Sequence, residues 1–447
     1  MKKTTKFQES APLLSALSLK PDSLSYSLIG ASQTISLVLS GLALPQALNN
    51  VFSTSGVTPA NRGAIQDLSY RTMRQVGRVD ALISAMTTKA PEPALLYSLL
   101  CCALALIVED DESLHPYAEF TVVDQAVDAA AAHPDIAHAK NMVNALLRRF
   151  LRERKALLAQ VMKLPAAQWN YPQWWIDASK AAYPQTWQAI LEAGNLQPPL
   201  TLRINQRSTS MSAYLSLLKE NGMQAHAIGE FAVRLEQAVP VVQIPGFSEG
   251  LVSVQDAAAQ LAAPLLDLQD GMRVLDACAA PGGKTCHLLE TADIDLLAVD
   301  SDQHRLAKIS ENLERLKLKS KVMVGDASKR DWWDGQQFDR VLADVPCTAS
   351  GIVRRHPDIR WLRRKADSAQ LATLSARILD NLWMMTKPNG KLLLVTCSIW
   401  PQESEAQAAA FAHRHQAKRL PAPGQLLPTA TSDADHDGLF FALFQKV

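Results

Sequence analysis

The chain has 447 residues, 48% of them hydrophobic and 20% charged, with a formal net charge of +1 at pH 7. This length and apolar content predict two or three domains with buried cores and exclude a disordered protein. Because the net charge is close to zero, any surface for nucleic acid must come from local basic clusters. The six cysteines form no Cys-x-x-Cys pair and no zinc-type set with histidine, which predicts a reduced, cytoplasmic protein without a metal site.

The first residues show no clear secondary-structure pattern, and residues 1–28 are expected to form a loosely ordered extension. The stretch 23–61 carries no charge, but serine, threonine, glutamine and asparagine interrupt it throughout. It therefore lacks the run of about 18 apolar residues that a membrane-spanning helix needs. A signal peptide is not expected either, because the basic start leads to Glu9 and then to only a short apolar patch.

Residues 29–160 are expected to form an all-helical domain, because apolar residues recur at helical spacing and no strand pattern interrupts them. The expected helices span residues 68–86, 94–108, 120–132 and 137–155. The last of these helices carries basic residues away from its apolar face. Such residues are candidate contacts for RNA phosphates, and for any single one a solvated face of a core helix is an equally good interpretation. They are Arg148, Arg149, Arg152 and Arg154.

Residues 161–250 contain four tryptophans and several prolines and are expected to form a small connecting α+β module, with a strand at 199–205. Residues 253–260 are expected to begin a helix. From there to residue 447, strands alternate with helices, which predicts a mainly parallel, doubly wound sheet in an α/β domain over 251–447. The expected strands span 272–275, 293–300, 321–324, 338–342 and 390–396, and the expected helices span 303–318 and 366–385.

A strand, a glycine turn and a helix start follow one another between Met272 and Glu290. Pro281-Gly-Gly283 allows a sharp turn, Thr285 is a candidate helix N-cap, and the backbone N–H groups of such a turn suit a ligand's oxygens. Asp300 ends the next strand, 24 positions after Asp276, which is close to the spacing of a ribose-binding acid. The glycines do not form Gly-x-Gly-x-x-Gly. The pattern therefore disfavours a dinucleotide, while S-adenosylmethionine fits.

Polar side chains gather at the carboxyl ends of the expected strands, where open α/β sheets bind their ligands. These residues are Asp276, Asp300, Asp326, Asp344, Cys347 and Cys397. A cysteine suits covalent catalysis on a pyrimidine, because C5 accepts a methyl group only after a nucleophile has added at C6. An acid beside the base, such as Asp344, can hydrogen-bond the ring nitrogen and steady the adduct.

Four motifs together resemble the Sun/Fmu type of bacterial RNA (cytosine-5) methyltransferases, within the Nol/Nop/Sun family. The motifs are Asp276-Ala-Cys-Ala-Ala-Pro-Gly-Gly-Lys-Thr285, Asp344-Val-Pro-Cys-Thr-Ala-Ser-Gly351 with Arg354-Arg-His-Pro-Asp358, Thr396-Cys-Ser398, and Gly438-Leu-Phe-Phe441. The resemblance runs from about residue 30 to residue 447. Val345, Gln402 and Ser404 depart from the usual residues of the family and affect only fine positioning.

The resemblance implies an S-adenosylmethionine-dependent enzyme that methylates C5 of a cytosine in 16S ribosomal RNA through a covalent cysteine adduct. It implies a Rossmann-like methyltransferase domain preceded by an all-helical domain that resembles the antitermination factor NusB and binds RNA. It makes Cys397 the nucleophile and Cys347 the residue that assists product release, with Asp344 beside them. The cofactor site it implies consists of Cys278, Ala279, Ala280, Pro281, Gly282, Gly283, Lys284, Asp300, Asp326 and Asp344. We expect a monomer, with no DNA substrate.

Two other functions remain open from the sequence. An assembly factor would keep the fold and the RNA surface without turnover, which the two cysteines disfavour. An NAD-dependent oxidoreductase is disfavoured by the absent third glycine. The densest basic run of the chain, residues 354–365, is predicted to bind RNA phosphates. The side chains expected to do so are Arg354, Arg355, Arg360, Arg363 and Arg364, and Trp361 either stacks or belongs to the core.

Overall fold

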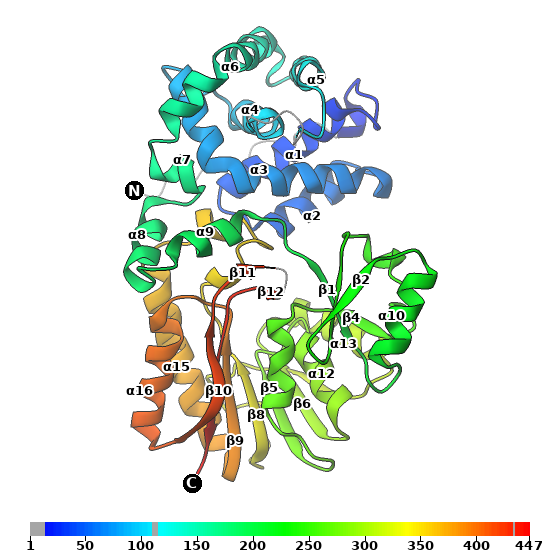
Figure 1. The fold of residues 1–447 in the computed structure, drawn as a ribbon, viewed down its shortest axis with the longest axis vertical. Coiled ribbons are helices and arrows are strands. Elements are labelled where there is room, and N and C mark those ends of the chain that lie inside the picture. The colour runs from blue at the N-terminus through cyan, green and yellow to red at the C-terminus, as the bar shows by residue number, and fades with distance from the viewer. Residues whose placement is uncertain (1–13, 110–114, 432–433) are drawn as a thin grey trace. The chain divides into compact units, whose positions relative to one another are not determined.

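The computed structural model describes residues 14–109, 115–431 and 434–447. These residues form two compact units (Figure 1). The first contains the described residues up to Ala181 together with His356–Leu362, and the second contains Ala182–Arg355 and Arg363–Val447. The first half of the expected N-terminal extension, residues 1–13, lies outside the described residues.

The first unit is helical, as its periodicity predicts. Its longer helices are α1 (Leu24–Leu39), α2 (Leu44–Thr54), α3 (Pro59–Met86), α4 (Ala94–Ile107), α5 (Glu119–Ala132), α6 (Lys140–Val161), α7 (Pro165–Trp169) and α8 (Gln173–Ala182). Helix α4 contains no charged residue and is buried on nearly every side, so it forms the centre of this unit. The expectation of a loosely ordered extension is wrong for residues 14–28, because Leu14, Leu24 and Leu28 are buried in the same core.

A short segment from late in the sequence, His356–Leu362, belongs to the helical unit and contains α14 (Ile359–Leu362). The Asp358 carboxylate accepts a hydrogen bond from the backbone N–H of Leu44 at 2.9 Å, at the start of α2. The Arg360 guanidinium donates to the carbonyl of Asn170 at 3.1 Å and lies 4.0 Å from the ring centre of Tyr171. Side chains of this segment are therefore structural parts of the helical unit.

The second unit begins with α9 (Trp187–Asn195) and a four-stranded antiparallel sheet in the order β2-β3-β1-β4. Its strands are β1 (Leu200–Ile204), β2 (Ala225–Ile228), β3 (Ala232–Leu235) and β4 (Val252–Val254), and α10 (Met211–Glu220) connects β1 to β2. The strand expected at 199–205 is confirmed as β1. The helix expected at 253–260 is wrong at its start, because Val252–Val254 pair with β1 and helical turns follow only at Ala258–Leu261 and in α11 (Ala262–Leu265).

A seven-stranded sheet forms the rest of the second unit, in the order β10-β13-β9-β8-β5-β6-β7. Its strands are β5 (Arg273–Ala277), β6 (Asp295–Asp300), β7 (Lys321–Val324), β8 (Phe338–Asp344), β9 (Thr386–Thr396), β10 (Lys418–Leu426) and β13 (Leu439–Gln445). Strands β5 to β9 are parallel, whereas β13 pairs antiparallel with both β9 and β10. The predicted mainly parallel sheet is confirmed, and the antiparallel edge adds two strands that we did not predict. A small hairpin, β11 (Thr429–Ala430) and β12 (Asp435–His436), precedes β13.

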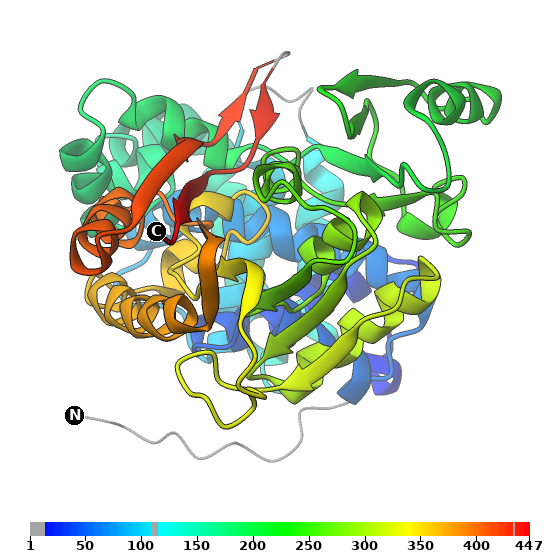
Figure 2. The same ribbon diagram turned by 90° about the horizontal axis from the view of Figure 1, so that it is seen from below.

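Alternate residues of the sheet enter two separate cores, one on each face. Leu275, Val341 and Leu394 pack with α15 (Asp367–Met385) and α16 (Glu405–His415), which Figures 1 and 2 show in orange on one side. Val274 and Leu342 pack with α12 (Gly283–Thr291) and α13 (Gln303–Arg315) on the other side. The sheet is therefore doubly wound, and all its parallel strands end at one edge.

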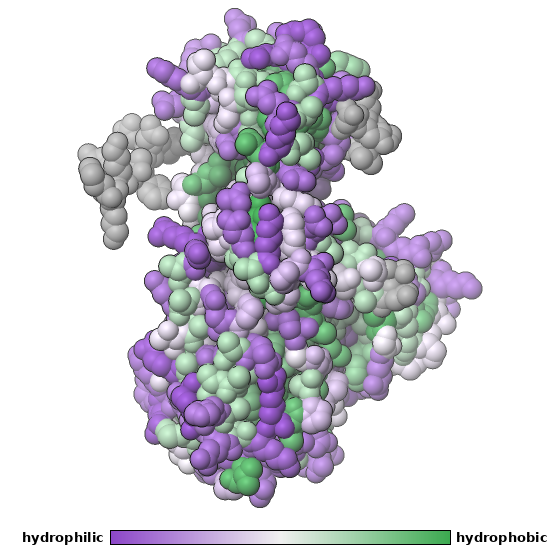
Figure 3. Space-filling model, turned by 60° about the vertical axis from the view of Figure 1, so that its left-hand side comes forward, coloured by the Kyte–Doolittle hydropathy of each residue, from purple (hydrophilic) through white to green (hydrophobic). Residues whose placement is uncertain are grey.

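Apolar side chains are concentrated in these interiors. Figure 3 shows hydrophilic residues spread over the visible surface of both units, with apolar residues in small areas between them. Within the described ranges, every helix is too short or too polar to cross a membrane.

Candidate active site

The turn between β5 and α12 has a backbone that requires particular residues. Gly282 has φ 96°, and a Cβ at this position would lie 3.0 Å from the Cα of Ile309 in α13. Cys278 also has positive φ, at 60°, directly after the strand. Gly282 occupies the N-cap position of α12, so the prediction that Thr285 caps this helix is wrong.

Thr285 instead ties α12 to the end of β5. Its hydroxyl donates to the Asp276 carboxylate at 2.6 Å, and both side chains are fully buried. Burial raises the pKa of Asp276 to about 7, because a charged carboxylate is poorly solvated there. The second carboxylate oxygen of Asp276 has no hydrogen-bond partner among the described residues.

Asp300 ends β6 and faces the same turn. Its carboxylate accepts hydrogen bonds from the backbone N–H of Ala280 at 2.9 Å and of Asp302 at 3.0 Å. The Arg305 guanidinium lies 4.0 Å away. Each carboxylate oxygen has two lone pairs, so Asp300 can still accept hydrogen bonds from a pair of hydroxyl groups.

Asp326 follows β7 and borders a hollow beside the Asp300 loop. The hydroxyl and the backbone N–H of Ser328 donate to one carboxylate oxygen, and these bonds lower the pKa of Asp326. The hollow has a volume of about 380 Å³. It is lined by Ser301, Met323, Val324, Gly325, Asp326, Asp331 and Trp332. Its apolar wall and the accepting carboxylate of Asp326 suit a flat heterocycle with an amino group.

Lys284 and Asp344 form an ion pair between the first turn of α12 and the end of β8, with Nζ 2.6 Å from Oδ2. Burial lowers the pKa of Lys284, but the charge of Asp344 and its hydrogen bond outweigh burial, so the pKa is raised. Lys284 therefore stays charged. Two of its N–H donors remain for an anionic group.

The two cysteines of the motifs lie side by side, with their sulfur atoms 3.5 Å apart. They follow neighbouring parallel strands, in which Asp344 of β8 is paired with Val395 of β9. The backbone N–H of Gly351 donates to the carbonyl of Cys397 at 2.8 Å and joins the two loops. The contact with Cys397, together with burial, raises the pKa of the Cys347 thiol.

The prediction that the basic run binds phosphates is wrong for three of its arginines. Arg354 is 1% exposed and donates to Asp437 at 2.5 Å and to Asp435 at 2.6 Å. Arg355 pairs with Asp437 and Asp256, and Arg360 is buried in the helical unit. Arg363 donates to the carbonyls of Thr348 and Cys347, while Arg364 is exposed. Trp361 packs against the core of the helical unit.

Four acids that hold this site were not predicted from the sequence. Asp256, Asp435 and Asp437 surround the arginine pair, and Glu403 lies between the two cysteine loops. Their signal in the sequence is weak. Each acid lies in a loop or a short turn, far along the chain from its partners, and a local pattern does not record such a pairing.

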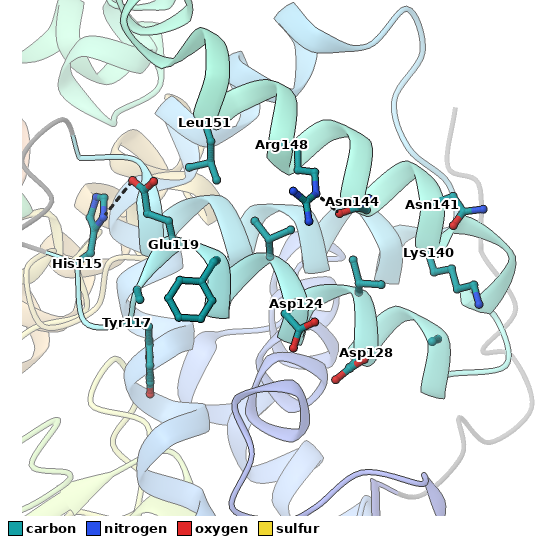
Figure 4. A pocket seen from close by; sticks show the side chains of 15 residues that line it. His115, Tyr117, Glu119, Asp124, Asp128, Lys140, Asn141, Asn144, Arg148 and Leu151 are labelled. Carbon is teal, nitrogen blue, oxygen red and sulfur yellow. Dashed lines mark hydrogen bonds and ion pairs between the residues drawn. The ribbon is translucent and has the colours of Figure 1, made fainter.

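Helices α5 and α6 of the helical unit border a cavity of about 760 Å³, shown in Figure 4. Arg148 lines it, and its guanidinium donates to Asn144 at 2.8 Å. Lys140 of α6 and Asp128 of α5 also line it. Arg154 is buried and paired with Glu119, so the prediction that it contacts phosphates is wrong.

The parallel sheet, the glycine turn at its edge and the acid that ends the neighbouring strand define the fold of an S-adenosylmethionine-dependent methyltransferase. Residues 263–442 match the family described as 16S rRNA methyltransferase RsmB/F. Residues 171–242 match the ferredoxin-like domain described for RsmF/B-like methyltransferases.

Whole-chain comparisons agree. The chain is 39% identical to the ribosomal RNA small subunit methyltransferase B of Vibrio cholerae over 404 residues, which cover 87% of this chain and 91% of that protein. It is 38% identical to the protein of the same name from Cronobacter sakazakii, with coverage of 87% and 92%. The crystal structure of PH0851 shares the fold, with a TM-score of 0.74 at 23% identity over 96% of this chain and 100% of that one. The chain belongs to the RsmB/F family of rRNA methyltransferases, and its cofactor is S-adenosylmethionine.

Proposed function

We propose that this protein methylates C5 of a cytosine in 16S rRNA through a covalent bond between Cys397 and C6. The observation that carries the proposal is the thiol pair at the edge of the sheet, with the two sulfur atoms 3.5 Å apart. A methyltransferase that acts on a nitrogen or a hydroxyl needs no thiol, because those atoms are already nucleophilic. Two adjacent thiols suit a target carbon that must be activated and then released.

The roles of the two thiols are those that the family resemblance implies, and their closeness supports them. The sulfur atoms lie 3.5 Å apart, so both thiols can reach the same base. The Cys397 thiolate adds to C6 of the flipped base, and C5 becomes nucleophilic and takes the methyl group. Removal of the C5 proton then breaks the C6–S bond and returns the thiolate. Cys347 assists this last step, either directly or by ordering a water molecule.

The residues around the turn fit the cofactor, which supplies the methyl group. Asp300 keeps lone pairs for the ribose hydroxyls, the hollow at Asp326 accepts the adenine, and Lys284 keeps donors for the carboxylate of the methionine part. The backbone of Cys278, Ala279, Ala280, Pro281, Gly282 and Gly283 borders the remaining part of the molecule. One carboxylate oxygen of Asp344 accepts a hydrogen bond from Lys284, and the second oxygen can form a hydrogen bond with the ring nitrogen of the base.

A denaturing gel with RNA and cofactor tests the two thiol roles. Cys347→Ala is expected to methylate once and remain attached to RNA as a shifted band. Cys397→Ala is expected to bind RNA and cofactor but to give no shifted band and no methyl transfer. The reverse pattern would exchange the roles, and the absence of an adduct from both variants would contradict the covalent mechanism.

The helical unit is the second part of the proposal. We infer that it binds rRNA with basic residues that remain exposed on α6, such as Arg148 and Arg152. We also infer a cytoplasmic location, because the nucleophilic thiol must stay reduced and the described cysteines are all free. We further expect the protein to act as a monomer.

A further inference from the structure

We propose that Glu403 is a positioning residue that fixes the spacing between the Cys347 and Cys397 thiols, an inference that rests on the roles proposed for them. Glu403 ends the short 3-10 turn Pro401–Glu403, and its side chain is buried between the two cysteine loops. No hydrogen bond joins it to either thiol among the described residues. Its charge contributes to the raised pKa of Cys347, and its hydrogen bonds act through the residues next to the two cysteines.

The carboxylate of Glu403 holds one residue from each loop. One oxygen accepts the backbone N–H of Thr348 at 3.0 Å, and the other accepts the Thr348 hydroxyl at 2.6 Å and the hydroxyl of Ser398. Thr348 directly follows Cys347, and Ser398 directly follows Cys397. A single rigid group therefore joins the residues adjacent to the two sulfur atoms.

The chemistry of the contacts requires a carboxylate. All three partners donate, and an ionised carboxylate has about four acceptor sites and no donor. Glutamine would keep the length but place an N–H₂ group where a carboxylate oxygen accepts, so at least one of the three hydrogen bonds would be lost or reversed. Burial raises the pKa of Glu403, and the hydrogen bonds from Ser398 and Thr348 oppose that rise.

Arg363 holds the same turn from its other side. Its guanidinium donates to the carbonyl of Thr348 at 3.1 Å and to that of Cys347 at 3.5 Å. Ser350 extends the connection, because its hydroxyl lies 3.1 Å from that of Ser398 and accepts the N–H of Ile399 at 2.9 Å. The Cys347 loop is thus fixed through its N–H, its carbonyl and its side-chain hydroxyl groups.

Glu403→Gln tests the proposal, with Glu405→Gln as the matched control. Glu405 lies two residues further along and pairs with Arg419 at the surface. For Glu403→Gln we expect kcat for methyl transfer to fall about ten- to hundredfold, the scale of a charged hydrogen bond. The KM for RNA and the affinity for S-adenosylmethionine should remain within about twofold of wild type, and Glu405→Gln should match wild type in every measurement.

A second measurement reports the sulfur spacing without methyl transfer. Diamide joins two neighbouring thiols as a disulfide and takes up their two electrons and two protons. The rate at which it joins Cys347 to Cys397, followed by mass spectrometry of peptides, should fall at least about fivefold in Glu403→Gln. Thr348→Val loses one hydrogen-bond donor and keeps the side-chain volume, and it should also lower the rate of disulfide formation. This variant replaces Glu403→Gln as the test if Glu403→Gln does not fold.

The outcomes separate this inference from the proposed function. Unchanged kcat and unchanged disulfide rate in Glu403→Gln would overturn the positioning role. Loss of cofactor affinity and kcat together would overturn it as well, because Glu403 would then support the fold in general. If no RNA adduct forms in any variant but the disulfide rate falls in Glu403→Gln, the positioning role stands and the covalent mechanism fails.

Discussion

The buried ion pair between Arg203 of β1 and Glu290 of α12 should be a strong determinant of stability in the second unit. The guanidinium donates to both carboxylate oxygens, at 2.9 and 2.7 Å, and the two side chains are 0% and 3% exposed. Arg203→Met leaves the Glu290 charge buried without its partner. We expect this change to lower the free energy of unfolding by about 3–5 kcal/mol.

The double variant Arg203→Met with Glu290→Leu should recover most of this stability. Replacing a buried ion pair by apolar residues of similar volume is often neutral or stabilising. Urea denaturation of the wild type, both single variants and the double variant measures the coupling energy. Lys308→Met, which breaks an exposed pair with Glu311, is the control and should cost less than about 1 kcal/mol.

The single change Arg203→Met should also weaken the binding of S-adenosylmethionine. Arg203 also donates to the carbonyl of Gly283 at 2.8 Å, in the first turn of α12. Calorimetry with S-adenosylmethionine should show lower affinity for Arg203→Met at temperatures where the variant is folded. A decrease in the free energy of unfolding of less than about 1 kcal/mol for Arg203→Met would refute the reasoning, since an unpaired buried carboxylate cannot be that inexpensive.

Three further outcomes are expected. Asp300→Ala should raise the dissociation constant for S-adenosylmethionine about ten- to hundredfold by calorimetry and leave RNA affinity unchanged, since it removes charge-assisted bonds of about 1.5–3 kcal/mol; equal affinity would reject the ribose role. The pKa of Asp276 is raised from 3.8 to about 7, so the folded protein binds more protons than the unfolded chain in this range. The contribution of Asp276 to the free energy of unfolding should therefore fall as pH rises from about 4 to about 7. Over the same pH range, the urea midpoint of Asp276→Asn should fall less than that of the wild type. Changing Lys140 and Arg148 to glutamine should weaken the salt dependence of RNA binding. The slope of the logarithm of the RNA association constant against the logarithm of the salt concentration should become shallower by about 0.7–0.9 for each phosphate that the protein no longer neutralises. An unchanged slope would exclude the α5–α6 face from the RNA interface.

The sequence predicted the parallel strands well, because each is a largely apolar run with a polar residue at or close to its end. The strand expected at 321–324 agrees at both ends with β7. The strand expected at 338–342 agrees with β8 at its start, and β8 continues two residues further, to Asp344. The geometry of a parallel sheet then brings distant strand ends to one edge, which is why Cys347 and Cys397 could be paired from the sequence. The β13 edge was missed, since an antiparallel strand at the end of the chain breaks the alternation on which the prediction relied.

The phosphate prediction failed for Arg354, Arg355 and Arg360 for a different physical reason. Charge density along a sequence shows how many cations lie close together, but it does not show which acids reach them through the fold. For Arg354 and Arg355 those acids are Asp256, Asp435 and Asp437, each at least 81 positions away. A buried guanidinium without such partners would cost several kcal/mol, so a run of arginines is equally compatible with an interior ion cluster and with a phosphate surface.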